Sequence, residues 1–409
     1  MLLNRDRALD RLTRDQLDAW VCVLPKHVYY LSDYESDWLF DLPWVACAIL
    51  PRDASLSPTL IIHDVELTNL AEKPSWMPTL RAYFASIDGR AISHYAADEA
   101  NELDALEQEV LSQEAKYASD GATSCLSATV ATLRSLGLGN ARIGFDDPRF
   151  RDACCAELPG LTGIDALAGL LWTRQVKTFD ELQLMQQAAV RNQRAIGAAL
   201  LACRENTSWS AVRRAYCVAA AMEDCSPASF FVGAGRKSMG LWANHDYPIR
   251  RSEPICMDAM LTFQRYFGDV QRTAVIGAAP TKLEKYWTAV ETAAAECYGA
   301  MRPGVNTADL RDKAIRTARS LGISHFRHAF VHGLGLDHLE LPGEGRAFGA
   351  FELETGMVVN MDLEVCELGF GGVYFEETMR ITRTGAESLY SLPRELIQLS
   401  RPLTGELRR

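Results

Sequence analysis

Five side chains of the kinds that bind divalent metal ions are spread over the second half of the chain. They comprise four carboxylates and one imidazole: Asp258, Asp269, His332, Asp362 and Glu376. Such ligands suit a pair of first-row ions such as Mn, Co, Fe or Zn, and two ions about 3.5–4 Å apart share bridging carboxylates and activate one water between them. Without metal, four acids converging in one cleft would repel one another. The residue types therefore indicate a hydrolytic centre with two divalent metal ions.

The spacing of the acids indicates the elements that must position them. Asp258 and Asp269 are eleven positions apart, and Asp362 and Glu376 are 14 positions apart. Each spacing allows two short antiparallel strands and a turn, and such a hairpin can aim two carboxylates into one cleft. The apolar runs around the acids predict these hairpins at 255–263 with 266–276, and at 356–365 with 372–382.

Helical patterns precede both hairpins. They predict helices at 178–203, 208–223, 281–301 and 307–321. Thr178, followed three residues later by Glu181, forms a capping-box signature for the first of these helices. Two helix pairs, each followed by a β-hairpin, indicate a pseudo-duplicated α+β domain, which we place at residues 169–409.

The first 168 residues follow a different pattern. Short apolar runs predict buried strands at 20–25, 44–51, 59–63 and 141–146, and the stretch between 102 and 138 is helical in character. Strands alternating with helices are typical of an α/β domain with a largely covered sheet. We therefore expect a separate N-terminal domain over residues 1–168.

The bulk composition limits the function classes. The chain has 409 residues, 48% of them hydrophobic, and a net charge of −11, which argues against broad nucleic-acid binding. It contains no charge-free apolar run of the ~20 residues needed to span a bilayer, and its start lacks the apolar segment of a secretory signal. The eleven cysteines form no C-x-x-C pair, which favours reduced thiols and a cytoplasmic location.

The order Asp, Asp, His-Gly-x-Gly, acid and Glu resembles that of the prolidase-type metallopeptidases. These enzymes belong to the pita-bread superfamily, together with Xaa-Pro aminopeptidases and creatinase. Four further segments are similar to family motifs: Arg302-Pro-Gly-Val, Gly356-Met, Arg174-Gln-Val-Lys-Thr and Val28-Tyr-Tyr-Leu-Ser-Asp-Tyr. The resemblance covers nearly the whole chain. It implies a C-terminal pita-bread catalytic domain preceded by a creatinase-type N-terminal domain.

The resemblance also implies a role for each of the five ligand-type residues. Asp258 would bind one metal ion, and Asp269 and Glu376 would bridge both ions. His332 and Asp362 would complete the second ion. Asp362 or Glu376 would also accept the proton of the attacking water.

Three more histidines and one tryptophan are implied on the substrate side. His245 matches a cleft histidine that acts as the general base in the creatinase branch and contacts substrate in the peptidases. His328 matches another substrate-side histidine of prolidases, and His338 is a third candidate for substrate binding. In the resembling enzymes the N-terminal domain reaches the active site of the partner subunit in a homodimer, and Trp38 is the ring that we expect there.

Two departures from the family pattern affect the same cleft. The family has a glutamate where this chain has Asp362, so the carboxylate is pulled back by one carbon–carbon bond, about 1.5 Å. Glu364, on the same strand face, is an alternative ligand. The family's His-Glu-x-Pro is Leu339-Glu-Leu-Pro here. His338 is the neighbour of the lost imidazole, but adjacent extended residues point in opposite directions.

These observations favour a metal-dependent hydrolase of peptide or amide bonds. It would resemble Xaa-Pro peptidases, take a short peptide or a small molecule, and could be retuned to a small non-peptide substrate. A metal-free hydrolase like creatinase or ectoine hydrolase, with His245 as base, is one alternative. A metal-dependent lyase on a small zwitterion such as dimethylsulfoniopropionate is another, and a non-catalytic binding module is the last. We expect a homodimer with no nucleic-acid or membrane partner.

Overall fold

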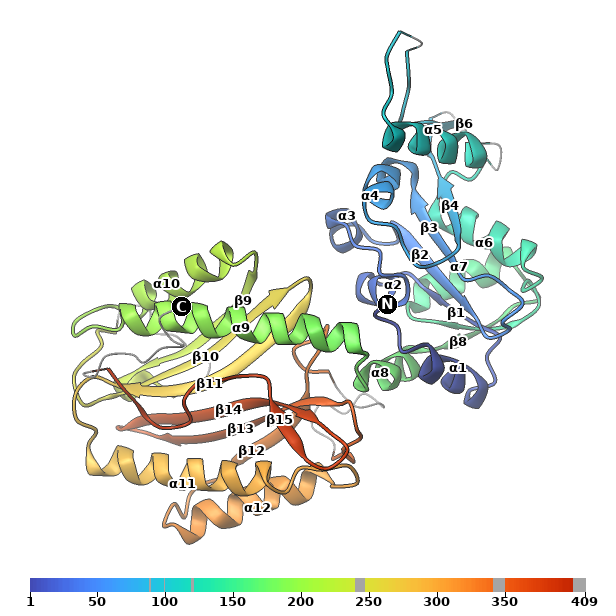
Figure 1. Cartoon of the computed structure of the whole chain (residues 1–409). Coiled ribbons are helices and arrows are strands. Elements are labelled where there is room, and N and C mark those ends of the chain that lie inside the picture. Colours follow the sequence, from blue (N-terminus) through green and yellow to red (C-terminus); the bar gives the residue numbers. More distant parts are fainter. Residues whose placement is uncertain (88–89, 99, 119–120, 240–246, 341–349, 400–409) are drawn as a thin grey trace. The chain divides into compact units, whose positions relative to one another are not determined.

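The structure is a computed structural model that describes residues 1–87, 90–98, 100–118, 121–239, 247–340 and 350–399. The chain divides into two compact units, Met1–Arg174 and Gln175–Arg409 (Figure 1). The boundary predicted between residues 168 and 169 lies inside the helix that ends the first unit. Among the described residues, no helix has the length and apolar character that crossing a membrane requires.

The first unit is built on a six-stranded mixed sheet with the strand order β4-β3-β2-β1-β7-β8. Its strands are β1 (Ala19–Cys22), β2 (Ala46–Pro51), β3 (Thr59–His63), β4 (Thr79–Tyr83), β7 (Arg142–Phe145) and β8 (Thr162–Asp165), and β5 (Ala85–Ile87) pairs with β6 (Arg90–Ile92). The helices are α1 (Arg5–Arg14), α2 (Pro25–Ser32), α3 (Asp37–Asp41), η1 (Asp64–Glu66), α4 (Leu67–Glu72), α5 (Ala105–Ala118), α6 (Cys125–Ser135), α7 (Pro148–Glu157) and α8 (Leu167–Gln175). This arrangement confirms an α/β unit.

Two elements of the first unit differ from the prediction. The strand expected at 20–25 ends at Cys22, and Pro25 begins helix α2 instead of ending the strand. Proline is favoured at the first helical position because its missing N–H has no intrahelical partner there. The helical stretch predicted between 102 and 138 is interrupted, with α5 and α6 as separate helices.

The second unit contains two four-stranded sheets, with the orders β16-β11-β10-β9 and β12-β13-β14-β15. The strands are β9 (Ser226–Ala234), β10 (Pro254–Phe263), β11 (Tyr266–Val275), β12 (His328–Gly333), β13 (Val358–Glu367), β14 (Gly371–Ile381), β15 (Ala386–Ser388) and β16 (Ile397–Gln398). The helices are α9 (Phe179–Ala202), α10 (Trp209–Met222), η2 (Gly235–Lys237), α11 (Thr281–Tyr298) and α12 (Thr307–Ser320). The two predicted helix pairs, each followed by a hairpin, are confirmed.

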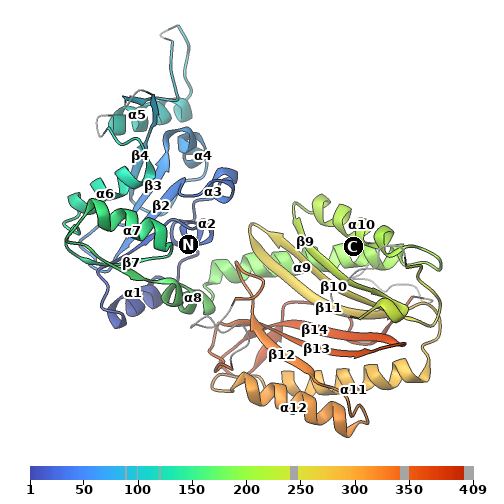
Figure 2. The same ribbon diagram turned by 180° about the vertical axis from the view of Figure 1, so that it is seen from behind.

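The sheets of the second unit lie between the two helix pairs. Helices α9 and α10 lie on one side and α11 and α12 on the other, as both views show (Figures 1 and 2). Strands β13 and β14 are amphipathic, and their apolar face packs in the core with α11 and α12 through Met361, Leu363, Val365, Val373, Phe375 and Met379. Because side chains alternate along a strand, the residues between these ones face the other sheet.

Helix α9 begins as its capping box predicts. The Thr178 hydroxyl accepts from the Glu181 N–H at 3.2 Å, and the Glu181 carboxylate accepts from the Thr178 N–H at 2.9 Å. Glu181 is also buried and accepts from the Tyr266 hydroxyl at 3.0 Å. The cap therefore ties the start of α9 to strand β11.

Candidate metal centre

Hairpin β10–β11 places two carboxylates on one face. Asp258 lies opposite Gln271, and Asp269 lies opposite Met260. The two aspartates are therefore diagonal neighbours across an antiparallel pair, within reach of each other on the same side of the sheet. Both are buried, with exposed fractions of 6% and 1%.

Hairpin β13–β14 supplies the second pair of carboxylates. Asp362 and Glu376 lie directly opposite each other, in the closest relation that two strands allow. Strand β12 pairs with β13 so that His332 lies opposite Asn360. His332 and Asn360 thus share the polar face with both acids.

The two polar faces meet, and they bring all five ligand-type residues together. Ligand atoms of Asp258, Asp269 and Glu376 lie within 4.8 Å of one another, and so do those of His332, Asp362 and Glu376. Glu376 belongs to both groups and joins them. This convergence is the main feature expected from the sequence, whereas the ligand roles remain predictions.

Hydrogen bonds between the sheets fix this approach. The Thr378 hydroxyl donates to the Asp269 carbonyl at 2.7 Å, and the Arg272 guanidinium donates to the Glu376 carbonyl at 2.7 Å. Arg272 is itself buried and forms an ion pair with Glu377 at 2.9 Å. The two hydrogen bonds join the two sheets close to the carboxylates and use backbone carbonyls instead of the carboxylate groups.

The electrostatics of the metal-free cluster are unfavourable for its charges. Burial raises the pKa of Asp258, Asp269 and Asp362, and the neighbouring carboxylates raise it further. Burial alone would also raise the pKa of Glu376, but attraction by the adjacent His332 imidazole brings it below the usual value. Burial lowers the pKa of His332, whereas the adjacent Asp362 and Glu376 carboxylates raise it to a net higher value. A cation placed among these acids would remove the repulsion.

The cluster also contains buried polar atoms that form no hydrogen bond with any residue that the structure describes. These atoms are both carboxylate oxygens of Asp269, Oδ1 of Asp362, Oε2 of Glu376 and Nε2 of His332. Buried polar atoms are rarely left without a partner, because desolvation without compensation is costly. Every one of these atoms is a metal-ligand type. The residues therefore fit a site for divalent ions.

The imidazole of His332 is oriented for ligation through Nε2. Its Nδ1 lies 2.9 Å from the Gly333 carbonyl, and a carbonyl only accepts, so Nδ1 must carry the proton. Nε2 then faces the acids, 3.6 Å from Asp362 Oδ1 and 3.5 Å from Glu376 Oε1. Such a backbone contact is the usual way of fixing the tautomer of a metal-binding histidine.

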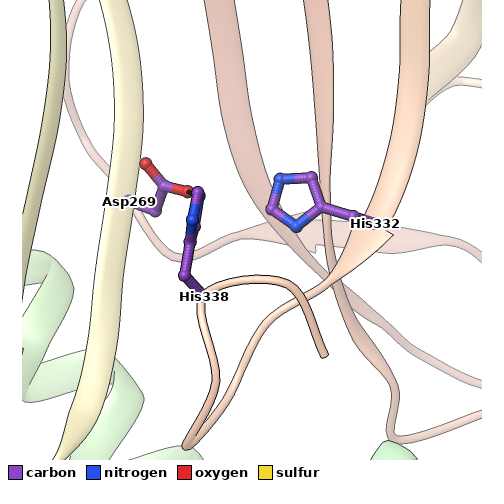
Figure 3. Close-up of side chains that lie close together, drawn as sticks. All are labelled: Asp269, His332 and His338. Atoms are coloured by element: carbon purple, nitrogen blue, oxygen red, sulfur yellow. Dashed lines mark ion pairs between the residues drawn. The ribbon is translucent and has the colours of Figure 1, made fainter. Parts of the chain in front are cut away.

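His338 reaches the same cluster from the loop after β12. Its Nε2 lies 3.1 Å from Asp269 Oδ2, and its ring centroid is 5.4 Å from that of His332 (Figure 3). Burial and the nearby His332 lower the pKa of His338 to about 4. Residues 335–339 form a series of bends and not an extended strand, so the rule that adjacent extended residues point in opposite directions does not apply to His338. Its role as a candidate site residue stays a prediction.

The loop Gly333–Glu340 is held by a buried ion pair that the sequence did not reveal. The ammonium group of Lys177, just before α9, contacts the Glu340 carboxylate, and both side chains are almost completely buried. Glu340 also accepts from the Leu336 N–H at 3.2 Å. A Cβ on Gly335 would lie 2.6 Å from the Glu340 carboxylate oxygens, so the His-Gly-x-Gly sequence makes room for this acid.

The other predicted site residues lie further from the cluster or outside the described residues. His328 is half exposed on β12, and its Nε2 lies 3.7 Å from Glu364. Glu364 accepts from Gln271 at 3.3 Å and belongs to none of the three close-set ligand groups among the described residues. Trp38 is 43% exposed in the first unit, where its ring contacts His63. His245 lies outside the described residues.

Sequence reasoning missed Asn360 as a member of the site. Its side-chain amide donates to Glu376 Oε1, and it is fully buried. Alternation along the strand could have identified it, since Asn360 lies two residues before Asp362 and must share its face.

Comparison with known proteins indicates the family of the second unit. Residues 183–383 match metallopeptidase family M24. This part of the chain is a domain of that family. The Xaa-Pro dipeptidase of Pyrococcus furiosus is 25% identical over 228 residues, which cover 55% of the present chain and 65% of that dipeptidase. The Xaa-Pro dipeptidase of Pyrococcus horikoshii is 29% identical over 153 residues, which cover 37% of the present chain and 43% of that dipeptidase.

These two alignments span less than two thirds of the length of either relative. Structural similarity extends further. The crystal structure of a dipeptidase from Pyrococcus horikoshii matches with a TM-score of 0.74 at 17% identity. The match covers 96% of the present chain and 99% of the dipeptidase. At this identity the similarity shows the fold alone. The chain therefore has the α+β pita-bread architecture preceded by an N-terminal domain. Metallopeptidases of this family use divalent metal ions, and the acidic and histidine groups described above could hold them.

Proposed function

We propose that this protein is a metal-dependent hydrolase of peptide or amide bonds with a prolidase-like cleft. The observation that carries the proposal is a set of buried carboxylate and imidazole atoms, gathered from two hairpins and strand β12, that form no hydrogen bonds within the described part of the chain. Such a set is costly to maintain in a fold unless a ligand satisfies it. The named relatives are Xaa-Pro dipeptidases, which favours short peptides as substrates.

We assign two divalent ions to the five residues. Asp258, Asp269 and Glu376 would hold one ion, and Glu376 and Asp269 would share the second ion with His332 and Asp362. When bound, the ions would polarise the scissile carbonyl and acidify the attacking water. The set of oxygen and imidazole donors suits Mn, Co, Fe or Zn.

The side chains of the protein supply the proton transfers. Asp362 and Glu376 face each other across β13 and β14, so either carboxylate can take a proton from a water held between the sheets. Asn360 donates to Glu376 Oε1 and thereby fixes one of its two oxygens. Burial of the whole cluster excludes bulk water and strengthens each of these interactions.

Metal analysis together with a substrate panel tests the proposal. Protein purified without chelator is expected to contain divalent metal, and its turnover of Xaa-Pro dipeptides or small amides should disappear after chelation. Separate addition of Mn, Co, Fe and Zn should restore turnover to different extents. Incorporation of labelled solvent oxygen into the product separates hydrolysis from elimination on a zwitterion. A metal-free preparation with full activity would contradict the proposal.

We further propose that the protein is a cytoplasmic homodimer. All eleven cysteines are free thiols, and eight of them are buried, the exceptions being Cys155, Cys217 and Cys366. Free thiols are usual in reduced compartments. Trp38 remains our candidate for a ring that reaches the cleft of the partner subunit, and sedimentation analysis tests the dimer directly.

A further inference from the structure

The close approach of His338 to Asp269 carries an inference about the metal centre itself. Asp269, His332 and His338 form a third group whose ligand atoms lie within 4.8 Å of one another. Figure 3 shows the carboxylate of Asp269 beside the His338 ring, with the His332 ring facing them. Asp269 comes from β11, His332 from β12 and His338 from the loop that follows β12.

The contact between His338 and Asp269 is not a hydrogen bond. Nε2 of His338 and Oδ2 of Asp269 are 3.1 Å apart, yet Oδ2 is a buried oxygen that has no hydrogen-bond partner among the described residues. Two donors bound to one ion through bonds of about 2.1 Å lie about 3.0 Å apart in an octahedral arrangement and about 3.4 Å apart in a tetrahedral one. The observed separation suits two ligands of a shared ion.

The surroundings hold His338 in this position. The Phe267 N–H donates to the Gly335 carbonyl at 2.9 Å, which fastens the loop to β11 two residues before Asp269. The Phe267 ring lies against the His338 ring, with centroids 6.0 Å apart. On the opposite side of the loop, Glu340 is anchored by Lys177. Contacts with strand β11 and the anchoring of its own loop therefore hold His338 in position before any ligand binds.

We propose that His338 is a metal ligand, and that it shares one ion with Asp269 and His332. The inference rests on the proposed metal-dependent function and specifies its donor set. Asp362 reaches one carbon–carbon bond less far than a glutamate would, and His338 adds a second imidazole on the side of Asp269. A centre with two imidazoles favours Zn, Fe or Co over Mn, because imidazole suits those ions better than hard, oxygen-preferring ones.

Proton magnetic resonance of the Co²⁺-loaded protein tests the proposal without any activity measurement. Each imidazole bound to Co²⁺ gives a strongly shifted N–H signal that disappears in heavy water. The wild-type protein is expected to show at least two such signals, and His338→Ala should lose one. His325→Ala, which removes an exposed histidine that contacts only Tyr286 among the ring contacts of the described residues, should keep them all.

Metal titration provides a second readout. His338→Ala and His338→Gln should weaken Co²⁺ and Zn²⁺ binding at least about 10–100-fold, with a smaller effect on Mn²⁺. If the shifted signals and the affinities are unchanged in both variants, His338 is not a ligand and the inference is overturned, while the proposed function stands. If wild-type protein takes up no metal at all, both the proposed function and this inference fail.

Discussion

Asp258 illustrates how a single residue can weaken the metal-free protein and still serve the site. It is 6% exposed and lies beside the carboxylates of Asp269 and Glu376, and burial together with Asp269 raises its pKa. Ionised acids in such a place are stable only with a cation nearby. A bound metal ion would therefore offset the unfavourable free energy of burying the Asp258 carboxylate.

We predict that Asp258→Asn stabilises the metal-free protein but abolishes its function. Removing one of four mutually repelling carboxylates should raise the unfolding temperature measured without metal. The same change should reduce turnover at least about 100-fold, since a metal ion contributes several kcal/mol to the transition state. Asp312→Asn, at an exposed aspartate paired with Arg311, is the matched control and should change neither property.

Glu181 gives a pH dependence that is separate from the metal site. Burial raises its pKa to about 8, and the nearby Glu340 adds to this effect. A carboxyl group with a raised pKa in the folded state favours the folded protein while it is protonated. This stability is present below the ordinary value of 4.5 and is lost as the pH rises towards 8.

We predict that Glu181→Gln flattens the decline of stability between pH 5 and pH 8. The amide keeps the size of the side chain and cannot ionise, so the difference between variant and wild type should grow by a few kcal/mol over this range, at about 1.4 kcal/mol per pKa unit. Urea unfolding of the metal-free protein at several pH values measures it. Asp180→Asn, at the exposed neighbour, should follow the wild-type curve. Parallel curves for Glu181→Gln would contradict the assigned pKa.

At the scale of elements, the loop Gly333–Glu340 depends on the absence of side chains. Gly333 and Gly335 leave space for the backbone and the carboxylate of Glu340, where a Cβ would lie 2.3 Å and 2.6 Å away. The carboxylate cannot retreat because Lys177 holds it from the other side. The position of His338 thus follows from two glycines and one buried ion pair.

We predict that Gly335→Ala destabilises the protein by about 1–3 kcal/mol, the usual cost of forcing extra atoms into a packed region. Metal affinity should fall as well, because the same loop carries His338 and follows His332. Denaturation and metal titration measure the two effects. Gly299→Ala, where the nearest atom would be 3.4 Å away, tests whether any glycine replacement has this effect and is expected to be neutral.

The sequence predicted the hairpins and helices of the second unit because their signals are local. Apolar alternation marks β10, β11, β13 and β14, and a capping box marks the start of α9. The edge strands β9 and β12 were not predicted. Strand β12 reads His-Ala-Phe-Val-His-Gly and is polar at both ends. It is a strand because it pairs with β13, which is a tertiary contact.

The site was predicted to a similar extent. The four acids and one imidazole follow from their order along the chain, whereas the direction of His338 does not. Alternation of side chains applies to extended residues, and the bends at 335–339 remove its basis. Lys177 and Glu340 each look like ordinary surface charges in the sequence, and only the folded chain brings them together inside the protein.

At the scale of the whole molecule, the chain consists of two units with separate cores. The first unit has a core of its own around the six-stranded sheet, and a core of the second unit lies between α11, α12 and the β13–β14 sheet. All of the five predicted metal ligands belong to the second unit. Ligand binding should therefore stabilise one unit directly and the other not at all.

We predict that calorimetry resolves this difference. Divalent metal at 100 times its dissociation constant should stabilise the second unit by about 2.7 kcal/mol and raise the transition assigned to it. The transition of the first unit should stay where it is. Asp269→Asn should remove the metal-dependent shift. A single transition that moves as one with metal would show instead that the two units unfold together.

The buried contact between Lys177 and Glu340 joins positions that are 163 residues apart. Translation at about 5–20 residues per second separates their synthesis by roughly 10 to 30 seconds. During that interval the nascent chain already exposes its complete first unit, while the lysine has no glutamate to meet. A polypeptide that ends before Glu340 also lacks Asp362 and Glu376, so truncated translation products would have no assembled metal centre and would be inactive.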